Sequence, residues 1–353
     1  MKTIVLVIPS LGHGGAERVM SELANEWVSQ GHTVHLILLV AHEQFYSIDE
    51  RVNVHQLDYK NRFKPMRLLS EAKLILKLRR LIIQLKPSFV LSFMLKYNIL
   101  TLAATMCTDV KVFVSDRSNP NKAVPKSLRF FRNLFYPRAQ GIIAQTEMAK
   151  SILSSSFPMS RIRVIPNPLR IVKCEGRYKG NKVILNMGRL ITSKGQKDLL
   201  YAFSMLDDPT WRLVILGDGP LREDLLVLAE KLNISNRVTL KGAVKNVDEW
   251  FEKASIFVFP SYSEGFPNAL AEAMSAGLPC VSYDCSAGPG DIIIDGENGF
   301  LVKVGDVQAL GDRLDLLISD EKLRDNFSQK ASNVSIHLNK ANIAASYLSF
   351  CIE

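Results

Sequence analysis

Paired cysteines, long apolar runs and low-complexity segments are absent from this chain of 353 residues. Its five cysteines form no CxxC pair and have no histidine at a metal-ligand spacing. We therefore expect reduced, mostly structural thiols in a cytosolic protein. No apolar run reaches the roughly 18 residues of a transmembrane helix. Residues 1–8 are too short for a signal peptide and are expected to form a buried strand.

Two common site signatures are also missing. Gly12, Gly14 and Gly15 do not complete the GxGxxG dinucleotide fingerprint, because Glu17 occupies its last position. A nicotinamide dehydrogenase is therefore disfavoured. The six histidines include no pair on one helix face, so we expect no metal site.

Acidic residues are scarce in the first half of the chain. Residues 1–170 hold 24 Lys+Arg against 11 Asp+Glu, a net charge of +13, whereas residues 171–353 hold 20 against 24. The excess is concentrated in residues 60–86, with nine basic residues and one acidic, and in residues 122–138, with five and none. Both segments interleave the charges with aliphatic or aromatic residues, and from about residue 65 the first is expected to be an amphipathic helix.

Such segments suit an anionic membrane surface. Nucleic acid is not expected as a partner, because no nucleic-acid fold motif accompanies the charge. The alternative is structural: the leucines of residues 68–83 would face the core and the lysines would be solvated. Both interpretations can hold, one for each face of the helix.

What is present fits an α/β protein. The length and the 47% hydrophobic content suit two domains, each with a buried parallel sheet. Apolar runs at 183–187, 213–216 and 256–259 each lead into a loop rich in glycine or polar residues. Strands that end in this way are typical of parallel sheets, which bind ligands at the carboxyl ends of their strands.

Charged residues lie in two of these loops. Arg189 and Lys194 follow the first run and suit a diphosphate. Glu264 stands in the loop after the third run, and Glu272 lies in an Ala-rich helical stretch that Pro267 is expected to open in its first turn. Carboxylates in such a setting suit sugar hydroxyls. Taken singly, each pair could also be ordinary solvated surface charge.

Four motifs together resemble the retaining glycosyltransferases of family 4. They are SLGHGGAER at 10–18, GRLITSKG at 188–195, GDG at 217–219 and EGFPNALAE at 264–272. The resemblance implies a GT-B fold, with two Rossmann-like domains whose parallel sheets face across a cleft. It implies an N-terminal domain at 1–168, a nucleotide-sugar-binding domain at 180–334, and a C-terminal helix at about 335–353 that packs back on the first domain.

The same resemblance assigns roles to residues. Arg189 and Lys194 are expected to neutralise the donor diphosphate, Glu264 to orient the transferred sugar, and Glu272 to bind the ribose. Arg117 takes the place of a histidine that many relatives use near the donor sugar, and an arginine cannot act as a general base. The remaining predicted contacts are Gly14, Gly15, Gly188, Gly219, Gly265, Phe266, Pro267 and Asn268. No metal and no other cofactor is expected.

The implied activity is transfer of a hexose or N-acetylhexosamine from a nucleoside-diphosphate sugar, with UDP as the expected nucleotide. The implied acceptor is a polyprenyl-pyrophosphate-linked glycan in bacterial O-antigen or capsule synthesis. The enzyme is then expected to be peripheral on the inner face of the cytoplasmic membrane. A GT-B sugar-nucleotide epimerase and a non-catalytic sugar-nucleotide-binding protein remain as alternatives.

Overall fold

The chain divides into two compact units. A computed structural model describes residues 1–12, 14–41, 44–59, 66–117, 119, 121, 123–170, 172 and 181–353, and only the backbone of 66–68. Unit 1 comprises Met1–Pro168 and Leu338–Glu353, and unit 2 comprises Leu169–His337. The second domain was expected to start near residue 180, but most of 171–180 lies outside the described residues.

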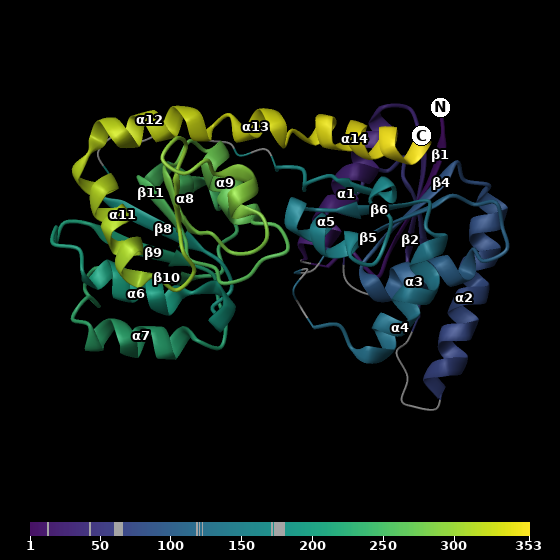
Figure 1. The fold of residues 1–353 in the computed structure, drawn as a ribbon, viewed down its shortest axis with the longest axis horizontal. Coiled ribbons are helices and arrows are strands. Elements are labelled where there is room, and N and C mark those ends of the chain that lie inside the picture. The colour runs from purple at the N-terminus through teal and green to yellow at the C-terminus, as the bar shows by residue number, and fades with distance from the viewer. Residues whose placement is uncertain are drawn as a thin grey trace. The chain divides into compact units, whose positions relative to one another are not determined.

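Unit 1 is built on one sheet whose pairings are all parallel (Figure 1). Its strands, within the described residues, are β1 Thr3–Ile8, β2 Thr33–Leu38, β3 Asn53–Gln56, β4 Phe89–Phe93, β5 Val112–Ser115, β6 Gly141–Ala144 and β7 Ile162–Val164. They lie in the order β3-β2-β1-β4-β5-β6-β7. The order reverses beside β1, and such a reversal is where doubly wound sheets bind ligands.

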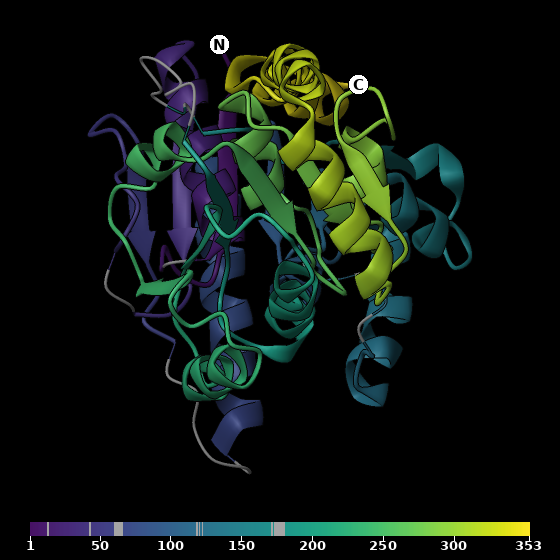
Figure 2. The same ribbon diagram turned by 90° about the vertical axis from the view of Figure 1, so that its left-hand side faces the viewer.

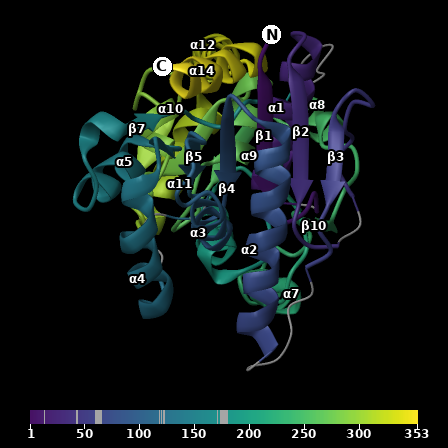
Figure 3. The same ribbon diagram turned by 90° about the vertical axis from the view of Figure 1, so that its right-hand side faces the viewer.

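Side chains of β1 alternate between two cores because successive residues of a strand point to opposite faces. Ile4 and Leu6 join the core made with α1 Gly15–Ser29 and α14 Lys340–Ile352. Val5 and Val7 join the other core. Helices α2 Met66–Leu85, α3 Leu95–Ala104 and α5 Glu147–Ser154 pack there, with α4 Lys126–Phe135 and the short turns η1 Tyr136–Arg138 and η2 Met159–Arg161 completing the unit (Figure 3). The sheet is therefore covered on both faces, as a parallel sheet requires.

Unit 2 repeats the same plan. Its strands, within the described residues, are β8 Val183–Met187, β9 Arg212–Leu216, β10 Val238–Gly242, β11 Ile256–Phe259, β12 Cys280–Tyr283 and β13 Phe300–Val302. All pairings are parallel, in the order β10-β9-β8-β11-β12-β13. Here the reversal falls between β8 and β11, so the loops that leave these two strands are neighbours.

Helices cover both faces of the second sheet (Figures 1 and 2). They are α6 Gln196–Ser204, α7 Arg222–Lys231, α8 Asp248–Lys253, α9 Asn268–Ser275, α10 Pro289–Ile292, α11 Val307–Ser319, α12 Glu321–Ala331 and α13 Val334–His337, with the turn η3 Thr192–Lys194. Helices α6, α7 and α11 form one layer, whereas α9 packs with α12 and α13. The predicted fold class, two Rossmann-like units with parallel sheets, is confirmed.

Candidate functional site

The loop after β8 is fixed in place by glycine. Gly195 ends η3 with φ +67°, a left-handed conformation that favours glycine. A Cβ atom there would lie 1.9 Å from the carbonyl oxygen of Pro260, which follows β11. Only glycine therefore allows the loop that carries Arg189 and Lys194 to pack directly on the end of β11.

The Gly-Asp-Gly segment after β9 packs on the same loop. The N–H of Leu190 donates to the carbonyl of Asp218 at 3.0 Å. A Cβ at Gly217 would lie 2.0 Å from the carbonyl oxygen of Gly188, and one at Gly219 would lie 2.5 Å from that of Leu190. The two glycine motifs singled out in the sequence thus hold each other through close backbone contact.

Lys194 and Glu264 meet at the reversal point of the second sheet. The Lys194 ammonium lies 2.5 Å from a Glu264 carboxylate oxygen, and the side chains are only 20% and 11% exposed. They come from loops 70 residues apart in sequence that leave β8 and β11. A cation and a carboxylate, little screened by water, therefore stand together where a ligand of such a sheet is expected.

The segment after Glu264 leads into α9. Phe266 and Pro267 are buried, and α9 begins at Asn268, one residue later than predicted, so that Pro267 precedes the helix instead of opening its first turn. Gly288, with φ +103°, packs against the ring of Pro267, where a Cβ would lie 2.2 Å from Cδ. The N–H of Asn268 donates to the carbonyl of Phe266 at 3.0 Å, so that N–H is engaged within its own turn.

Cys285 lies near Lys194 and Glu264 and stays a thiol. Burial, and next the charge of Glu264, raise the pKa of Cys285 to about 11. Cys280, Cys285 and Cys351 are buried and Cys107 is exposed, all unpaired as disulfides. Cys174 lies outside the described residues. The expectation of reduced, mostly structural thiols agrees with these four.

Glu272 has a protein partner that the sequence did not indicate. It lies in α9 between buried alanines and is 8% exposed. Its carboxylate accepts from Nε of Arg170 at 2.8 Å, and Nη1 of Arg170 lies 2.6 Å from Asp248 of α8. A buried carboxylate needs a partner, so the Ala-rich sequence around Glu272 indicated that it has one. The sequence near Glu272 could not identify that partner, because Arg170 lies 102 positions away.

Other predicted positions lie in the same neighbourhood. At Gly188 a Cβ would lie 3.6 Å from Cδ of Lys194, an ordinary van der Waals distance. Arg189 is exposed at the surface of its loop, and Gly265 follows Glu264 directly. The side-chain amide of Gln196 donates to the carbonyl of Arg189 at 3.1 Å. The structure thus gathers the predicted residues of unit 2 at the carboxyl edge of one sheet, while their roles stay predictions.

Two predicted contacts belong to unit 1. Gly14 precedes α1 and Gly15 begins it. The carboxylate of Glu17, in the first turn of α1, lies against Gly14, where a Cβ would be 2.0 Å from Oε2. The substrate contacts of the two glycines stay predictions. His13, weighed as an acceptor contact, lies outside the described residues.

Arg117 is committed to contacts inside unit 1. It is partly buried, and burial lowers the pKa of its guanidinium. It donates to the Tyr347 hydroxyl at 2.9 Å and to Oδ1 of Asn167 at 2.7 Å. The guanidinium also lies 4.3 Å from the ring centroid of Phe93. These contacts tie α14 to the end of β5, and donor binding by Arg117 stays a prediction.

The two basic segments form helices with exposed apolar side chains. Helix α2 buries Leu74, Leu78 and Ile82, whereas Leu69, Leu76 and Ile83 are exposed. The apolar side chains of α2 therefore lie on two faces, one packed in the core and one exposed to solvent. This arrangement is compatible with both the structural and the membrane-binding interpretation of the segment. Residues 60–65 lie outside the described residues.

Helix α4 buries none of its residues. Phe130, Phe131 and Leu134 are exposed on it beside Lys126 and Arg129. Because α2 follows β3 and α4 follows β5, both helices start at the carboxyl edge of the first sheet.

No helix among the described residues is both long and apolar enough to cross a membrane. No group of three or more His, Cys, Asp or Glu side chains in that part of the chain could hold a metal ion.

Two family models match consecutive parts of the chain. The family model for Glycosyltransferase Family 4 matches residues 13–171, and the model for Glycosyl transferases group 1 matches residues 170–334. One curated relative, from Campylobacter jejuni subsp. jejuni serotype O:2, is the GalNAc-alpha-(1->4)-GalNAc-alpha-(1->3)-diNAcBac-PP-undecaprenol alpha-1,4-N-acetyl-D-galactosaminyltransferase. It is 29% identical, over 100% of this chain and 99% of its own length.

Two further matches also span nearly the whole chain. The amylovoran biosynthesis glycosyltransferase AmsD of Erwinia amylovora is 27% identical over 94% of this chain and 93% of its own length. The crystal structure of Anabaena Alr3699/HepE in complex with UDP has a TM-score of 0.83 at 18% identity, and the match covers 99% of each chain. The second likeness concerns the fold alone.

Proposed function

This chain belongs to the family 4 glycosyltransferases with the GT-B fold, and on that premise we propose its reaction. It transfers a hexose or N-acetylhexosamine from a UDP-sugar, with retention, to a polyprenyl-pyrophosphate-linked glycan in bacterial surface polysaccharide synthesis. The observation that carries the proposal is the Lys194–Glu264 pair at the reversal point of the second sheet. The printed activities of the Campylobacter and Erwinia relatives support the lipid-linked acceptor and the polysaccharide product.

In this proposal the donor diphosphate binds at the loop after β8. Arg189 is exposed and Lys194 is part-buried there. They neutralise the charge that develops on the departing diphosphate, so that no metal or other cofactor is needed. Lys194 has three N–H donors, which lets it hold Glu264 and a phosphate oxygen together.

The carboxylates bind the sugar parts of the donor. Glu264, fixed by Lys194, orients the transferred sugar, and Glu272 accepts hydrogen bonds from the ribose hydroxyls. A carboxylate has about four acceptor positions, so the bond from Arg170 leaves capacity and fixes the orientation. The backbone at Gly188, Gly219, Gly265, Phe266, Pro267 and Asn268 completes the donor contacts within unit 2.

The chemical step needs no protein nucleophile. The acceptor hydroxyl attacks the anomeric carbon from the face that the diphosphate leaves. The bond from the anomeric carbon to the diphosphate oxygen breaks, and the acceptor proton passes to a phosphate oxygen. The rate comes from orientation and from the fixed positive charges.

The acceptor's lipid places the enzyme at a membrane. We assign the exposed apolar and basic side chains of α2 and α4, described for residues 69–85 and 126–135, to the anionic inner face of the cytoplasmic membrane. The exposed Leu69, Leu76, Phe130 and Phe131, described above, insert at the interface. The protein is then peripheral at this surface.

A thermal-shift screen tests the donor site. We expect UDP-sugars, and not GDP- or ADP-sugars, to raise the melting temperature in EDTA. Lys194→Ala is expected to lower turnover about a hundredfold, the effect of one electrostatic transition-state contact. The matched control is Lys197→Ala, which removes a half-exposed lysine paired with Asp224 at 3.7 Å and is expected to keep normal turnover.

Product analysis separates the alternatives. With a polyprenyl-diphosphate-linked glycan, proton NMR should show an α-linked product from an α-linked donor. Epimerised UDP-sugar without transfer would indicate the epimerase. Binding of UDP-sugar without either reaction would indicate a non-catalytic protein, and equal turnover of Lys194→Ala and Lys197→Ala would remove Lys194 from the diphosphate.

A further inference from the structure

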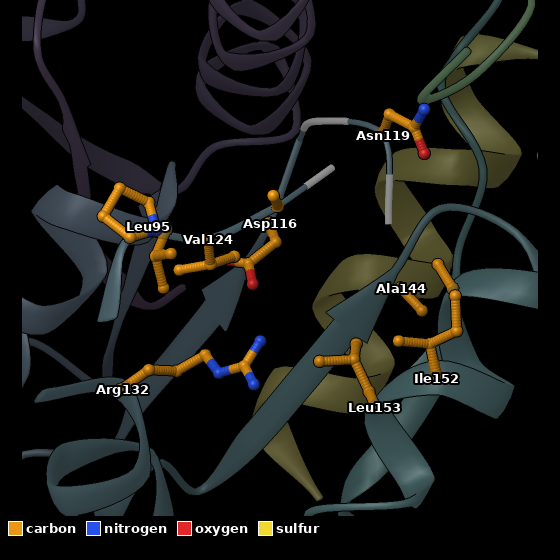
Figure 4. Close-up of a pocket in the computed structure, with 11 residues that line it drawn as sticks. Leu95, Asp116, Asn119, Val124, Arg132, Ala144, Ile152 and Leu153 are labelled. Atoms are coloured by element: carbon orange, nitrogen blue, oxygen red, sulfur yellow. The ribbon is translucent and has the colours of Figure 1, made fainter. Parts of the chain in front are cut away.

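Unit 1 contains a cavity that the proposed reaction does not use. Its volume is about 200 Å³, and it opens at the carboxyl edge of the first sheet. Leu95 follows β4, Asp116 follows β5 and Ala144 ends β6. Arg132 of α4 and Leu153 of α5 complete the walls (Figure 4). Because ligands of parallel sheets bind at this edge, the cavity lies where a substrate can reach it.

A carboxyl group and a guanidinium line one side of the cavity. Figure 4 shows the carboxyl group of Asp116 and the guanidinium of Arg132 directed into it. Asp116 accepts from the Tyr136 hydroxyl at 2.5 Å and from the amide of Asn98 at 3.0 Å. Burial raises the pKa of Asp116, and the charge of Arg132 opposes that rise. An anionic ligand would lie unfavourably against the Asp116 carboxyl group, and a cationic ligand against the Arg132 guanidinium. The two side chains together therefore favour a neutral ligand that both donates and accepts hydrogen bonds.

Arg132 also has an unused donor. Its Nε atom is buried and, among the described residues, has no hydrogen-bond partner. A buried donor left unpaired destabilises the folded chain. A ligand oxygen that accepts from this N–H would offset that destabilisation. The guanidinium is held nearby by the ring of Phe157, whose centroid is 5.9 Å away.

The opposite wall is apolar. Ile152 and Leu153 of α5 line it, with Ala149 on the same helix and Val124 across from them. Aliphatic walls of this kind favour a methyl group and disfavour a bare hydroxyl. An aliphatic cavity of about 150 Å³ holds a benzene-sized ligand, so the space here suits a substituent or a single sugar ring and not an oligosaccharide.

We propose that this cavity binds the acetamido group of an N-acetylated sugar in the acceptor glycan. The acetamido oxygen accepts from Arg132, its N–H faces Asp116, and its methyl group lies against Ile152 and Leu153. The inference rests on the proposed function, which supplies a glycan acceptor. It makes unit 1 selective for an acceptor whose terminal sugar carries an N-acetyl group.

Saturation-transfer NMR on the full chain tests the proposal. The probes are the methyl glycosides of N-acetylgalactosamine and N-acetylglucosamine, with those of galactose and glucose as the unacetylated counterparts. We expect the acetamido methyl to receive the strongest saturation and the unacetylated glycosides to bind about tenfold more weakly, the effect of one charge-assisted hydrogen bond. Equal binding of the two sets, or no saturation of the methyl group, would overturn the inference.

Cavity-filling variants locate the binding. Ala149→Leu places a larger side chain in the cavity and should abolish the methyl signal. The control Met148→Leu changes the neighbouring residue on α5, which is 41% exposed and outside the cavity lining, and should bind normally. Ala123→Phe fills the cavity from an exposed, non-helical position and serves where Ala149→Leu fails to fold. Wild-type binding by both filled variants would refute the assignment.

The arginine is tested by a matched pair. Arg132→Met keeps the apolar stem but removes the donor, and it should reduce the preference for acetamido glycosides about tenfold. Arg129→Met removes an exposed cation from the same helix and should leave that preference unchanged. Equal effects of the two changes would mean that Arg132 does not contact the ligand.

The same samples separate this inference from the donor assignment. Stabilisation by a UDP-sugar together with no acetamido preference would refute the cavity assignment alone. An acetamido preference without UDP-dependent stabilisation or transfer would leave the cavity as a sugar site and refute the proposed reaction.

Discussion

Arg170 bridges two carboxylates on different helices of unit 2, Asp248 of α8 and Glu272 of α9. Arg170→Met would leave the nearly buried Glu272 without its charged partner. We expect a loss of about 2 kcal/mol in the free energy of unfolding, measured by urea denaturation, because an uncompensated carboxylate is costly away from water. Glu272→Gln in the same chain should recover part of that loss.

A surface ion pair supplies the control. Lys182 pairs with Asp208 at 3.2 Å, and these side chains are 49% and 33% exposed. Lys182→Met should therefore cost no more than about 1 kcal/mol. A cost equal to that of Arg170→Met would show that the bridge adds nothing beyond a surface pair.

Asp116 makes stability depend on pH in a direction opposite to that of most carboxylates. Burial raises its pKa above 3.8 in the folded state. From about pH 4 upward the folded chain keeps a proton that the unfolded chain releases, so this group's contribution to stability falls as pH rises through that window. In Asp116→Asn the loss is absent. Urea unfolding at intervals from pH 4 to pH 7 should show wild type losing stability relative to the variant.

The difference between wild type and Asp116→Asn isolates the pH dependence due to Asp116, since both chains carry all the other titratable groups. Parallel curves for wild type and Asp116→Asn over this range would contradict a raised pKa at Asp116.

Among the elements, α2 has exposed basic side chains that can contact an anionic membrane. Lys73, Lys77 and Arg80 are exposed on it. Their replacement by Gln should weaken sedimentation with anionic vesicles at low salt about a hundredfold, at about 1 kcal/mol per charge, and far less at high salt. Arg79 is left unchanged, because its guanidinium donates to the carbonyls of Ala104 and Met106 at 2.9 and 2.6 Å.

The matched control removes as many charges from unit 2. Lys303, Lys322 and Lys330 are all exposed, and their replacement by Gln should leave vesicle binding nearly unchanged. If both triple variants lost binding equally, only net charge would matter, and α2 would have no special place at the membrane.

The aromatic residues of α4 give a different signature. Phe130→Ser with Phe131→Ser removes two exposed rings from a helix that buries none of its residues. Vesicle binding should fall by a factor that hardly changes with salt, because the lost contribution is apolar. If vesicle binding were lost only at low salt, these two rings would not insert into the membrane.

How far the sequence predicts such elements depends on how local their cause is. Strands and their loops were predictable, because Gly195 and Gly217 mark turns that only glycine allows. The pairing of Glu272 with Arg170 was not, since it joins positions 102 apart. Arg117 is engaged by Tyr347, 230 positions away, so its burial is a product of the fold. For the same reason, the motif order predicted the loop that carries Lys194 but not the cavity beside Arg132.

At the scale of the whole molecule, unit 1 depends on both ends of the chain. Ile343, Ala344 and Tyr347 of α14 are buried in its core, and the indole N–H of Trp27 donates to the carbonyl of Ala344 at 3.1 Å. Deleting residues 338–353 should expose Trp27 and shift its emission to the red in a Trp211→Phe/Trp250→Phe background. UDP-dependent stabilisation should persist, because the predicted donor residues of α9 and its loops lie in unit 2.

Ser349→Ala in the full-length chain is the control, since it removes only an exposed hydroxyl contact to Glu353. Its Trp27 emission should match that of wild type. A truncated chain with the same emission as the full chain would show that α14 is dispensable for the core of unit 1.

The return of α14 also sets an order of events during synthesis. Unit 2 is contiguous, from Leu169 to His337, and all of it is synthesised before α14 is made. At about 5–20 residues per second, roughly ten to thirty seconds pass between the end of the first segment of unit 1 and its final helix. Throughout that time Trp27 and the apolar residues around it are not yet covered by α14. The first segment of unit 1 is therefore made first but completes its core last. A nascent-chain chaperone would find an exposed hydrophobic surface there.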